Sequence, residues 1–196
     1  MLQVRFHGRG GQGVVTAAEL LALAAFVEGR HAQAFPSFGS ERTGAPVVSF
    51  CRIDDAPIRT REPILEPDAV IIQDVTLVHQ VDLFSGLEAD GYVLINTSRS
   101  FEELGLAALV ERLRPERLAT VPATELARQH VGRPLPNAAL LGGMAALTSA
   151  VSLGALEGAI RERFPGPIGD ANVAAARAAH DHVRRELGER AHAATA

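Results

Sequence analysis

The chain has 196 residues, 47% of them hydrophobic, which is enough for one domain with a core and rather short for two. Its formal net charge of −4 gives no general attraction to nucleic acids or anionic membranes, so we expect neither as a partner. The single cysteine, Cys51, excludes an internal disulfide and any cysteine-ligated iron–sulfur cluster or zinc site of its own. We therefore expect a cytoplasmic protein without a signal peptide or a membrane span.

The first third of the chain predicts a strand, a helix and two more strands. Residues 2–7 alternate apolar and polar side chains, which is typical of a strand. Residues 14–28 are apolar on nearly every helical face and predict a buried helix. Strands are expected at 31–35 and 47–53, separated by a loop at 36–46. The second of these strands lies close to a turn and is a candidate for antiparallel pairing.

The rest of the chain alternates further strands with helices. Residues 68–74 and 91–98 are continuously apolar at their centres, like strands buried on both faces of a parallel sheet. Ser100 and Glu103 form a capping-box pattern that predicts a helix to about Leu113. A strand is expected at 117–122. Three more helices are expected to start at Asn137, Ser152 and Asp170.

These elements predict an α/β protein with three α/β/α layers and a mostly parallel sheet, with room for one antiparallel strand. We expect a single domain over residues 1–187, where the last helix ends. Residues 188–196 are expected to form a flexible tail.

A glycine-rich loop connects the first expected strand to the first expected helix. Gly8, Gly10 and Gly13 fit the pattern G-x-G-x-x-G between an expected strand and an expected helix. Gly11 is a fourth residue without a side chain in this turn. Glycine lets a phosphate approach the backbone, while a helix N-terminus offers free N–H donors and partial positive charge. Arg9 adds a cation, and we expect the amides around Gln12, Gly13 and Val14 to face the anion.

Three interpretations of this loop stay open on the residues alone. A nicotinamide or flavin dinucleotide site expects an acid at the end of the second strand, and none stands there in "EGRHAQAFPSF". Another phosphate-bearing ligand, such as a nucleotide-containing coenzyme, fits without that acid. In the third interpretation, the glycines only let the helix pack close to the sheet.

Other polar residues follow the expected strands, where ligands collect in open parallel sheets. Thr97 and Ser98, with Asp74, Thr76 and Asn96, are expected to share one rim with the glycine loop, although residues such as Thr97 and Ser98 also serve as helix caps. Ser37 and Arg42 lie on a long loop with two interpretations: a binding loop for a phosphate or carboxylate, or a solvated surface loop. Helix capping is sufficient to explain Asn137, which is also a candidate cofactor-binding residue. The predicted cofactor-binding set is Gly8, Arg9, Gly10, Gly11, Gln12, Gly13, Val14, Ser37, Arg42, Thr97, Ser98 and Asn137.

No catalytic apparatus is evident in the sequence. The seven histidines form no ligand set, and His180 and His182 are two apart on a helix, so they face different ways. Neither a Ser-His-Asp nor a Cys-His arrangement stands out, and no carboxylate pair is placed for acid–base work. We therefore predict no catalytic residue and no metal ligand in this chain.

Several stretches together resemble the gamma subunit of the 2-oxoacid:ferredoxin oxidoreductases, which include pyruvate:ferredoxin oxidoreductase. They follow the family's order from residue 4 to about 178, with Thr43 as a departure in the second stretch, and Asn172 follows the last of them. They are "GRGGQGVVTAAELLA", "PSFGSERTGAPVVSFCRI", "PDAVIIQD", "VPATELA", "NAALLGGMAAL" and "AIRERFP".

The resemblance implies a subunit whose complex oxidatively decarboxylates a 2-oxoacid to an acyl-coenzyme A. It implies that thiamine diphosphate, Mg and 4Fe-4S clusters sit in partner subunits of alpha, beta and delta type, which pass electrons to ferredoxin. It also implies that this chain contributes to coenzyme A binding and shields the active site. The alternatives are a stand-alone NAD(P)-dependent oxidoreductase and a non-catalytic structural module of a redox complex.

Overall fold

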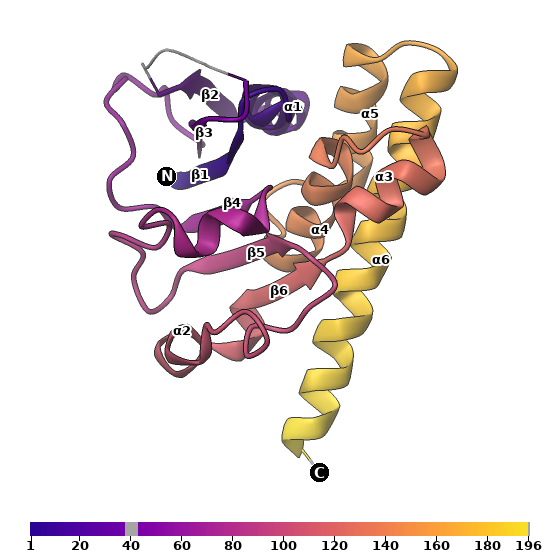
Figure 1. Ribbon diagram of the computed structural model, residues 1–196. Helices are drawn as coiled ribbons and strands as arrows, with labels where there is room; N and C mark the ends of the chain where they lie inside the picture. The colour runs from indigo at the N-terminus through magenta and orange to yellow at the C-terminus, as the bar shows by residue number, and fades with distance from the viewer. Residues whose placement is uncertain (38–42, 196) are drawn as a thin grey trace.

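The computed structural model describes residues 1–37 and 43–195, and Figure 1 shows the chain path. Within these residues, one sheet contains six strands: β1 (Leu2–Arg9), β2 (His31–Pro36), β3 (Pro46–Asp54), β4 (Ala69–Ile72), β5 (Tyr92–Asn96) and β6 (Leu118–Val121). The α-helices are α1 (Val14–Val27), α2 (Ala107–Arg112), α3 (Ala123–Val131), α4 (Asn137–Thr148), α5 (Leu153–Arg163) and α6 (Pro167–Thr195). Two 3₁₀ helices are η1 (Val75–His79) and η2 (Pro115–Arg117).

The sheet has the strand order β2-β3-β1-β4-β5-β6. β1, β4, β5 and β6 pair in parallel, whereas β3 is antiparallel to both of its neighbours, β1 and β2. The predicted α/β architecture with a mostly parallel sheet is therefore confirmed, and so is the antiparallel strand at 47–53.

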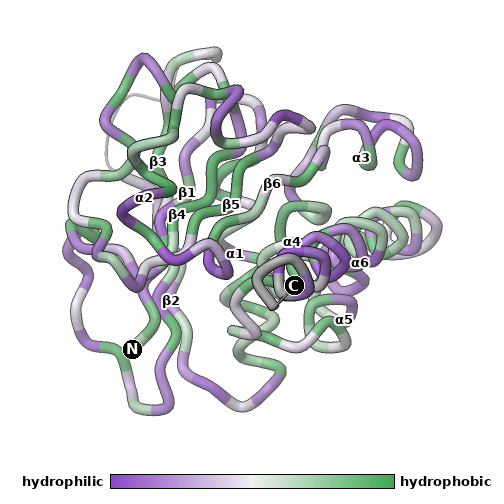
Figure 2. The backbone as a smooth tube through the Cα atoms, turned by 90° about the horizontal axis from the view of Figure 1, so that it is seen from below, coloured by the Kyte–Doolittle hydropathy of each residue, from purple (hydrophilic) through white to green (hydrophobic). Residues whose placement is uncertain are grey.

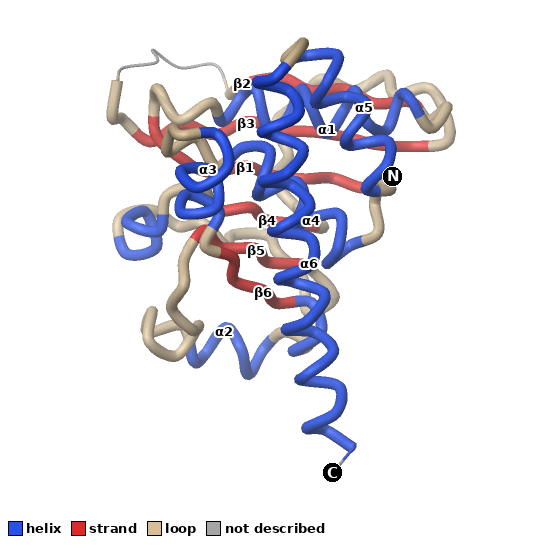
Figure 3. The backbone as a smooth tube through the Cα atoms, turned by 90° about the vertical axis from the view of Figure 1, so that its right-hand side faces the viewer, coloured by secondary structure: helices blue, strands red, loops and turns tan. Residues whose placement is uncertain are grey.

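Helices cover the two faces of the sheet unequally. Figure 3 shows α1, α4, α5 and α6 as a thick layer in front of the strands, with α3 beside them. This layer packs on side chains such as Val4, Phe6 and Ile71 in the larger hydrophobic cluster. The opposite face, with Val70 and Ile72, is covered by η1, α2 and their loops in a smaller cluster. In Figure 2, the central strands are accordingly hydrophobic, while polar residues concentrate in the outer loops.

The chain changes direction between β1 and β4. From β1 it crosses through α1 toward β2, on one side of the sheet, and from β4 it continues through η1 toward β5 and β6, on the other. In open α/β sheets, such a switch point leaves a crevice beyond the carboxyl ends of the two strands. The glycine loop and residues 73–74 lie at this point.

The predicted helix at 100–113 is wrong over its first half. Ser100 and Glu103 do form the reciprocal capping-box bonds, Ser100 N–H to Glu103 Oε2 at 2.8 Å and Glu103 N–H to Ser100 Oγ at 3.2 Å. A turn follows instead of a helix, because Gly105 adopts a positive φ of 73° and breaks the helical path. The helix α2 begins only at Ala107.

Other element boundaries also differ from the prediction. Residues 123–131 form α3, which the sequence analysis missed, and Gly132 ends it with a φ of 77°. The last helix, α6, starts before Asp170 and extends past Leu187 to Thr195. The division into a domain and a flexible tail stays a prediction.

Candidate functional site

The glycine loop has a backbone that only glycine adopts readily. Gly11 and Gly13 have φ angles of 92° and 72°, in the left-handed region. Gly13 is also the N-cap residue of α1, and no side chain of residues 1–37 or 43–195 caps this helix end. The first turn of α1 contains no acidic residue. The sequence therefore leaves this helix N-terminus open.

The backbone N–H groups at the start of α1 have no hydrogen-bond acceptor in the described part of the chain. Within the described residues, no protein acceptor is bonded to the N–H of Gly11 or Gly13, nor to those of residues 14–16. The first intrahelical bond in α1 is from Ala17 N–H to the Gly13 carbonyl at 3.0 Å. Unpaired donors at a helix N-terminus, together with the helix dipole, form a binding site for an anion.

An open cleft of about 740 Å³ lies against these donors, and we call it the glycine cleft. Its described lining contains no acidic side chain and consists of Arg9, Gly10, Gly11, Gly13, Val14, Val15, Thr16, Pro36, Ser37 and Val47. The predicted residues Val14 and Ser37 are thus brought together with the glycine loop. Arg42 lies outside the described residues.

Arg9 lines the glycine cleft, but its charge is already paired. Its Nε lies 3.2 Å from Asp74 Oδ2, and its Nη2 donates to Thr76 Oγ1 at 2.8 Å and to Gln80 Oε1 at 2.7 Å. Its Nη1 donates to the carbonyl of Gly44 at 3.0 Å. The guanidinium therefore ties the glycine loop to η1 and to the loop before β3, in addition to any role toward an anion.

Gln12 holds the loop in shape. Its Oε1 accepts from the N–H of Arg9 at 2.8 Å, and its Nε2 donates to Asp74 Oδ2 at 2.7 Å. Burial would raise the pKa of Asp74, but hydrogen bonds from Thr76 and Gln12 and the charge of Arg9 outweigh it and lower that pKa. Asp74 is therefore a carboxylate at neutral pH, able to accept all of these bonds.

Two glycines of the loop are required by close packing. A Cβ on Gly8 would lie 2.6 Å from Val14 Cγ2, and a Cβ on Gly13 would lie 2.3 Å from Asn137 Nδ2. At Gly11, a Cβ would meet no atom of the described residues within 4 Å, so among these residues only the φ angle of 92° requires glycine there. The loop therefore packs against Val14 and Asn137 on one side and borders the glycine cleft on the other.

The capping role expected for Asn137 is wrong. Asn137 is the first residue of α4, the N-cap position belongs to Pro136, and no side chain caps this end. The Asn137 side chain instead packs behind Gly13, and its Oδ1 accepts a hydrogen bond from Gln73 Nε2 at 3.3 Å. It supports the loop from the interior and does not line either cleft described here.

Thr97 and Ser98 line a second cleft of about 310 Å³, which we call the strand-end cleft. It lies beyond the carboxyl ends of β4, β5 and β6 and is lined by Gln12, Gln73, Asp74, Val75, Asn96, Thr97, Ser98, Pro122, Thr124 and Glu125. Gln12 lines this cleft and precedes Gly13, which lines the other. The glycine loop and the strand-end residues Thr97 and Ser98 thus share one rim but line two separate clefts.

Hydrogen bonds hold the strand ends together beneath this rim. Asn96 Nδ2 donates to the carbonyl of Gln73 at 2.8 Å and to Thr124 Oγ1 at 2.7 Å. The N–H of Thr124 donates back to Asn96 Oδ1 at 3.0 Å. Asn96 therefore fixes β4 against the start of α3.

The described part of the chain contains no group of three His, Cys, Asp or Glu side chains placed to hold a metal ion. Cys51 is buried, and burial raises the pKa of its thiol, so it is not a reactive thiolate.

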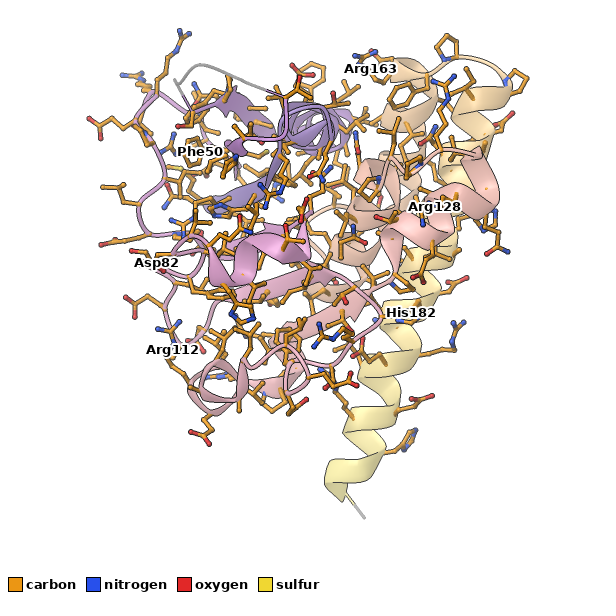
Figure 4. All side chains as sticks on the ribbon, in the orientation of Figure 1. Phe50, Asp82, Arg112, Arg128, Arg163 and His182 are labelled. Carbon is orange, nitrogen blue, oxygen red and sulfur yellow. The ribbon has the colours of Figure 1, made fainter. Side chains whose placement is uncertain are left out.

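None of the described helices combines the length and apolar character needed to cross a bilayer. The side chains on view in Figure 4 include His182, which lies on α6, away from the glycine loop.

Sequence reasoning missed several residues that line the two clefts. Among them, Val15 and Thr16 line the glycine cleft as the second and third residues of α1, and Gln73 lines the strand-end cleft. Their only sequence signal is position: Val15 and Thr16 come within three residues after the G-x-G-x-x-G pattern, and Gln73 follows an apolar strand.

Comparisons with known proteins show which proteins the chain is similar to. The sequence profile of the pyruvate ferredoxin/flavodoxin oxidoreductase family matches residues 3–182. The chain is 48% identical over 186 residues to the "Pyruvate/ketoisovalerate oxidoreductases common subunit gamma" of Pyrococcus abyssi, covering 94% of this chain and 98% of that one. It is also 48% identical over 184 residues to the "Pyruvate synthase subunit PorC" of Methanothermobacter marburgensis, with the same coverage.

A solved structure has the same fold. The crystal structure of pyruvate oxidoreductase subunit PORC from Thermotoga maritima matches with a TM-score of 0.77 and 36% identity. The match covers 92% of this chain and 95% of that one.

Proposed function

The chain belongs to the pyruvate ferredoxin/flavodoxin oxidoreductase family as a gamma-type subunit of a 2-oxoacid:ferredoxin oxidoreductase, and on this premise we propose that its glycine cleft binds the phosphate groups of coenzyme A. The observation that carries the proposal is the uncapped N-terminus of α1, with unpaired N–H groups facing an open cleft. The donors are fixed before the ligand arrives, so little ordering cost opposes binding.

The walls of the glycine cleft suit the rest of such a ligand. Val15, Pro36 and Val47 give it apolar surface beside the amide donors, and its described lining carries no carboxylate. A long neutral arm attached to a phosphate would therefore be buried without unpaired charge. This chain would hold the coenzyme in place and exclude water on that side, while the bond-breaking steps occur elsewhere.

We assign the reaction itself to partner subunits. Thiamine diphosphate, Mg and 4Fe-4S clusters would supply decarboxylation of the 2-oxoacid and transfer of electrons to ferredoxin. The single, buried Cys51 cannot ligate a cluster, which supports placing these groups in alpha-, beta- and delta-type subunits. Pyruvate is the substrate suggested by the named relatives, and a cytoplasmic complex fits a chain with one thiol.

The stand-alone dinucleotide site is disfavoured by the sheet order. Such a site takes its ribose-binding acid from the end of a parallel strand next to β1. Here the neighbour on the side of β2 is β3, which is antiparallel and ends at Asp54, at the opposite edge from the glycine loop.

Substitution of Thr16 by glutamate tests the proposal. Thr16 is the third helical residue of α1 and lines the glycine cleft, so a carboxylate there would occupy the anion site with its own charge. In the reconstituted complex, we expect Thr16→Glu to raise the KM for coenzyme A about tenfold, the equivalent of about 1.4 kcal/mol. Acids near a helix N-terminus add about 0.3–1 kcal/mol of stability, so the fold should not weaken.

Thr16→Gln is the matched control, because it has the same shape without the charge. Steady-state kinetics with coenzyme A, together with thermal unfolding of each variant, would separate binding from folding. An unchanged KM in a folded Thr16→Glu complex would contradict the proposal.

A further inference from the structure

The two edges of the sheet differ in how their backbone groups are covered. β6 forms one edge and β2 the other, and Figure 3 shows α6 running past the β6 side. At that edge, Arg190 Nη1 donates to the carbonyl of Leu118 at 2.6 Å, so a side chain of α6 takes the place of a further strand. Within the described residues, β2 has only β3 as a hydrogen-bonded neighbour.

Ala32 and Ala34 carry the free backbone groups of β2. The N–H of Ser37 donates to the carbonyl of Val48 at 2.9 Å, which continues the antiparallel ladder between β2 and β3. Because alternate residues of such a ladder bond to the same neighbour, Gln33 bonds toward β3, whereas Ala32 and Ala34 point their N–H and C=O groups away from it. No described residue bonds to these outward groups. An open edge of this kind is a template for pairing with another strand.

The side chains of β2 and its surroundings do not protect this edge. Proteins commonly guard an open edge with charged residues, and the six residues of β2 include no Lys, Arg, Asp or Glu. Phe26 and Val27, at the end of α1 and separated from β2 by residues 28–30, are 70% and 53% exposed. Apolar surface therefore lies close to the free backbone groups.

The edge is complementary to itself about Gln33. When two copies pair antiparallel with Gln33 opposite Gln33, Ala32 of each copy faces Ala34 of the other, and their outward N–H and C=O groups bond to one another. Pro36 of each copy is then opposite Arg30 of the other. Pro36 has no N–H, and the N–H of Arg30 already bonds within its own turn, so no donor is left over at the end of the ladder.

Gln33 also has an unmet acceptor at this central position. Its Oε1 is buried, and no described residue donates a hydrogen bond to it. A carboxamide carries donors as well as an acceptor, so two that face each other can exchange hydrogen bonds. Gln33 opposite Gln33 is a non-hydrogen-bonded backbone pair, the kind in which side chains approach most closely. A second copy can therefore supply the donor that one chain lacks.

We propose that β2 pairs with β2 of a second copy of this chain, antiparallel and with Gln33 opposite Gln33, so that one sheet continues through both chains. Because α1 packs beside β2, the two α1 helices come together across the same two-fold axis and cover Phe26. The matching uses residues of this strand alone, as an interface between identical chains requires. The proposal is independent of what the glycine cleft binds.

A cross-link at Gln33 tests the register. Opposite residues in such a pair have Cβ atoms about 4.5–5.5 Å apart, so Gln33→Cys should form a disulfide between two chains when copper phenanthroline is the oxidant. His31→Cys is the matched control on the same face of β2, because its two copies would lie about 13 Å apart, beyond the reach of a disulfide. Non-reducing electrophoresis should show most of the Gln33→Cys chain linked and His31→Cys unlinked, in the isolated full chain and in the reconstituted complex.

Substitution of Ala34 by proline tests the backbone pairing. Ala34→Pro removes an outward N–H and leaves the bonds to β3 in place, a position where an edge strand tolerates proline. Ala34→Gly is the matched control, because it also weakens the strand but keeps the N–H. Light scattering over a dilution series should show the wild-type chain and Ala34→Gly as dimers and Ala34→Pro as a monomer. Circular dichroism would check that each variant is folded.

Three results would overturn the proposal. The first is a wild-type chain that is monomeric at every concentration, a measurement that stands even if Ala34→Pro does not fold. The second is equal linking of Gln33→Cys and His31→Cys, which would show random collision. The third is linking of Gln33→Cys in the isolated chain but not in the complex, which would assign this edge to a strand of another subunit.

Discussion

At the scale of single residues, the interior of β1 is polar on one side. Arg5 and His7 are both buried, and Arg5 Nε donates to His7 Nε2 at 3.0 Å. Arg5 Nη2 donates to the carbonyls of Leu83 and Ser85, both at 2.8 Å. The apolar–polar alternation that predicts β1 therefore places Arg5 and His7 on the sheet face that η1, α2 and their loops cover.

His7 should make the stability of the protein depend on pH. Burial, and then the charge of Arg5, lower the pKa of His7 to about 3 in the folded chain, below the usual value near 6.5. Between these two values the unfolded chain binds a proton that the folded chain does not, so stability falls as the pH falls through that range. The slope is at most about 1.4 kcal/mol per pH unit.

His7→Gln should flatten this dependence, because glutamine can accept from Arg5 without titrating. Urea unfolding of both proteins at several pH values between 6.5 and 4 would measure it. The prediction fails if the two proteins lose stability in parallel over that range.

At the scale of elements, α4 and α6 approach each other at Gly142. A Cβ there would lie 2.0 Å from the carbonyl oxygen of Ala176, a backbone atom that cannot turn aside. Gly143 beside it has looser surroundings, with the nearest atom, Val183 Cγ2, at 3.3 Å from a Cβ. The glycine pair in this helix is thus explained by close packing, and mainly by its first member.

Gly142→Ala should therefore destabilise the fold although alanine favours a helix. Overpacking costs typically about 1–3 kcal/mol, which exceeds the gain of about 1 kcal/mol in helix propensity. Gly158→Ala in α5 is the control, because a Cβ there meets no described atom within 4 Å. Chemical unfolding should show Gly142→Ala below wild type and Gly158→Ala equal to it or above. The reverse order would contradict the packing argument.

The helix predicted from the local capping signal and the observed structure differ most at Ser100. Its capping box forms as the spacing predicts, yet Gly105 turns the chain before a helix can grow. By contrast, Ser152 caps α5 as expected, accepting from the N–H of Ala155 at 3.1 Å, because no glycine with a positive φ follows within the first turn. A capping signal is therefore informative about a turn and not about the length of the helix after it.

At the scale of the whole molecule, the candidate site lies at the carboxyl ends of the parallel strands, and we propose that it holds a ligand while the reaction occurs on partner subunits. The clefts bring together amides, hydroxyls and carboxamides, and within the described residues no nucleophile–base pair faces them. Such a chain should be inactive by itself.

We expect the isolated chain to show no oxidation of pyruvate in the presence of coenzyme A and ferredoxin. Activity should appear when alpha-, beta- and delta-type subunits are added, and the purified chain should contain no iron or thiamine. Reduction of ferredoxin, followed spectroscopically, would measure the first part, and metal analysis the second. Turnover by the chain alone would contradict the assignment of the chemistry to partners.

The sequence by itself determined the fold class, the glycine loop and most of the strands. Strand β4 and helix α1 are continuous apolar segments whose burial depends on composition more than on neighbours, so their pattern is readable locally. The φ angles of Gly11 and Gly13 are likewise local, since no other residue adopts them so readily.

Only the tertiary structure decided how the site is assembled. The pairing of Arg9 with Asp74, the place of Asn137 behind Gly13 and the hydrogen bond from Gln73 to the Gln12 carbonyl each join segments more than 60 residues apart. Contacts at that separation arise from strand order and helix packing, which no local spacing encodes. The sequence could therefore locate the glycine loop, which we propose binds an anion, whereas the sheet order had to place a second cleft beside it.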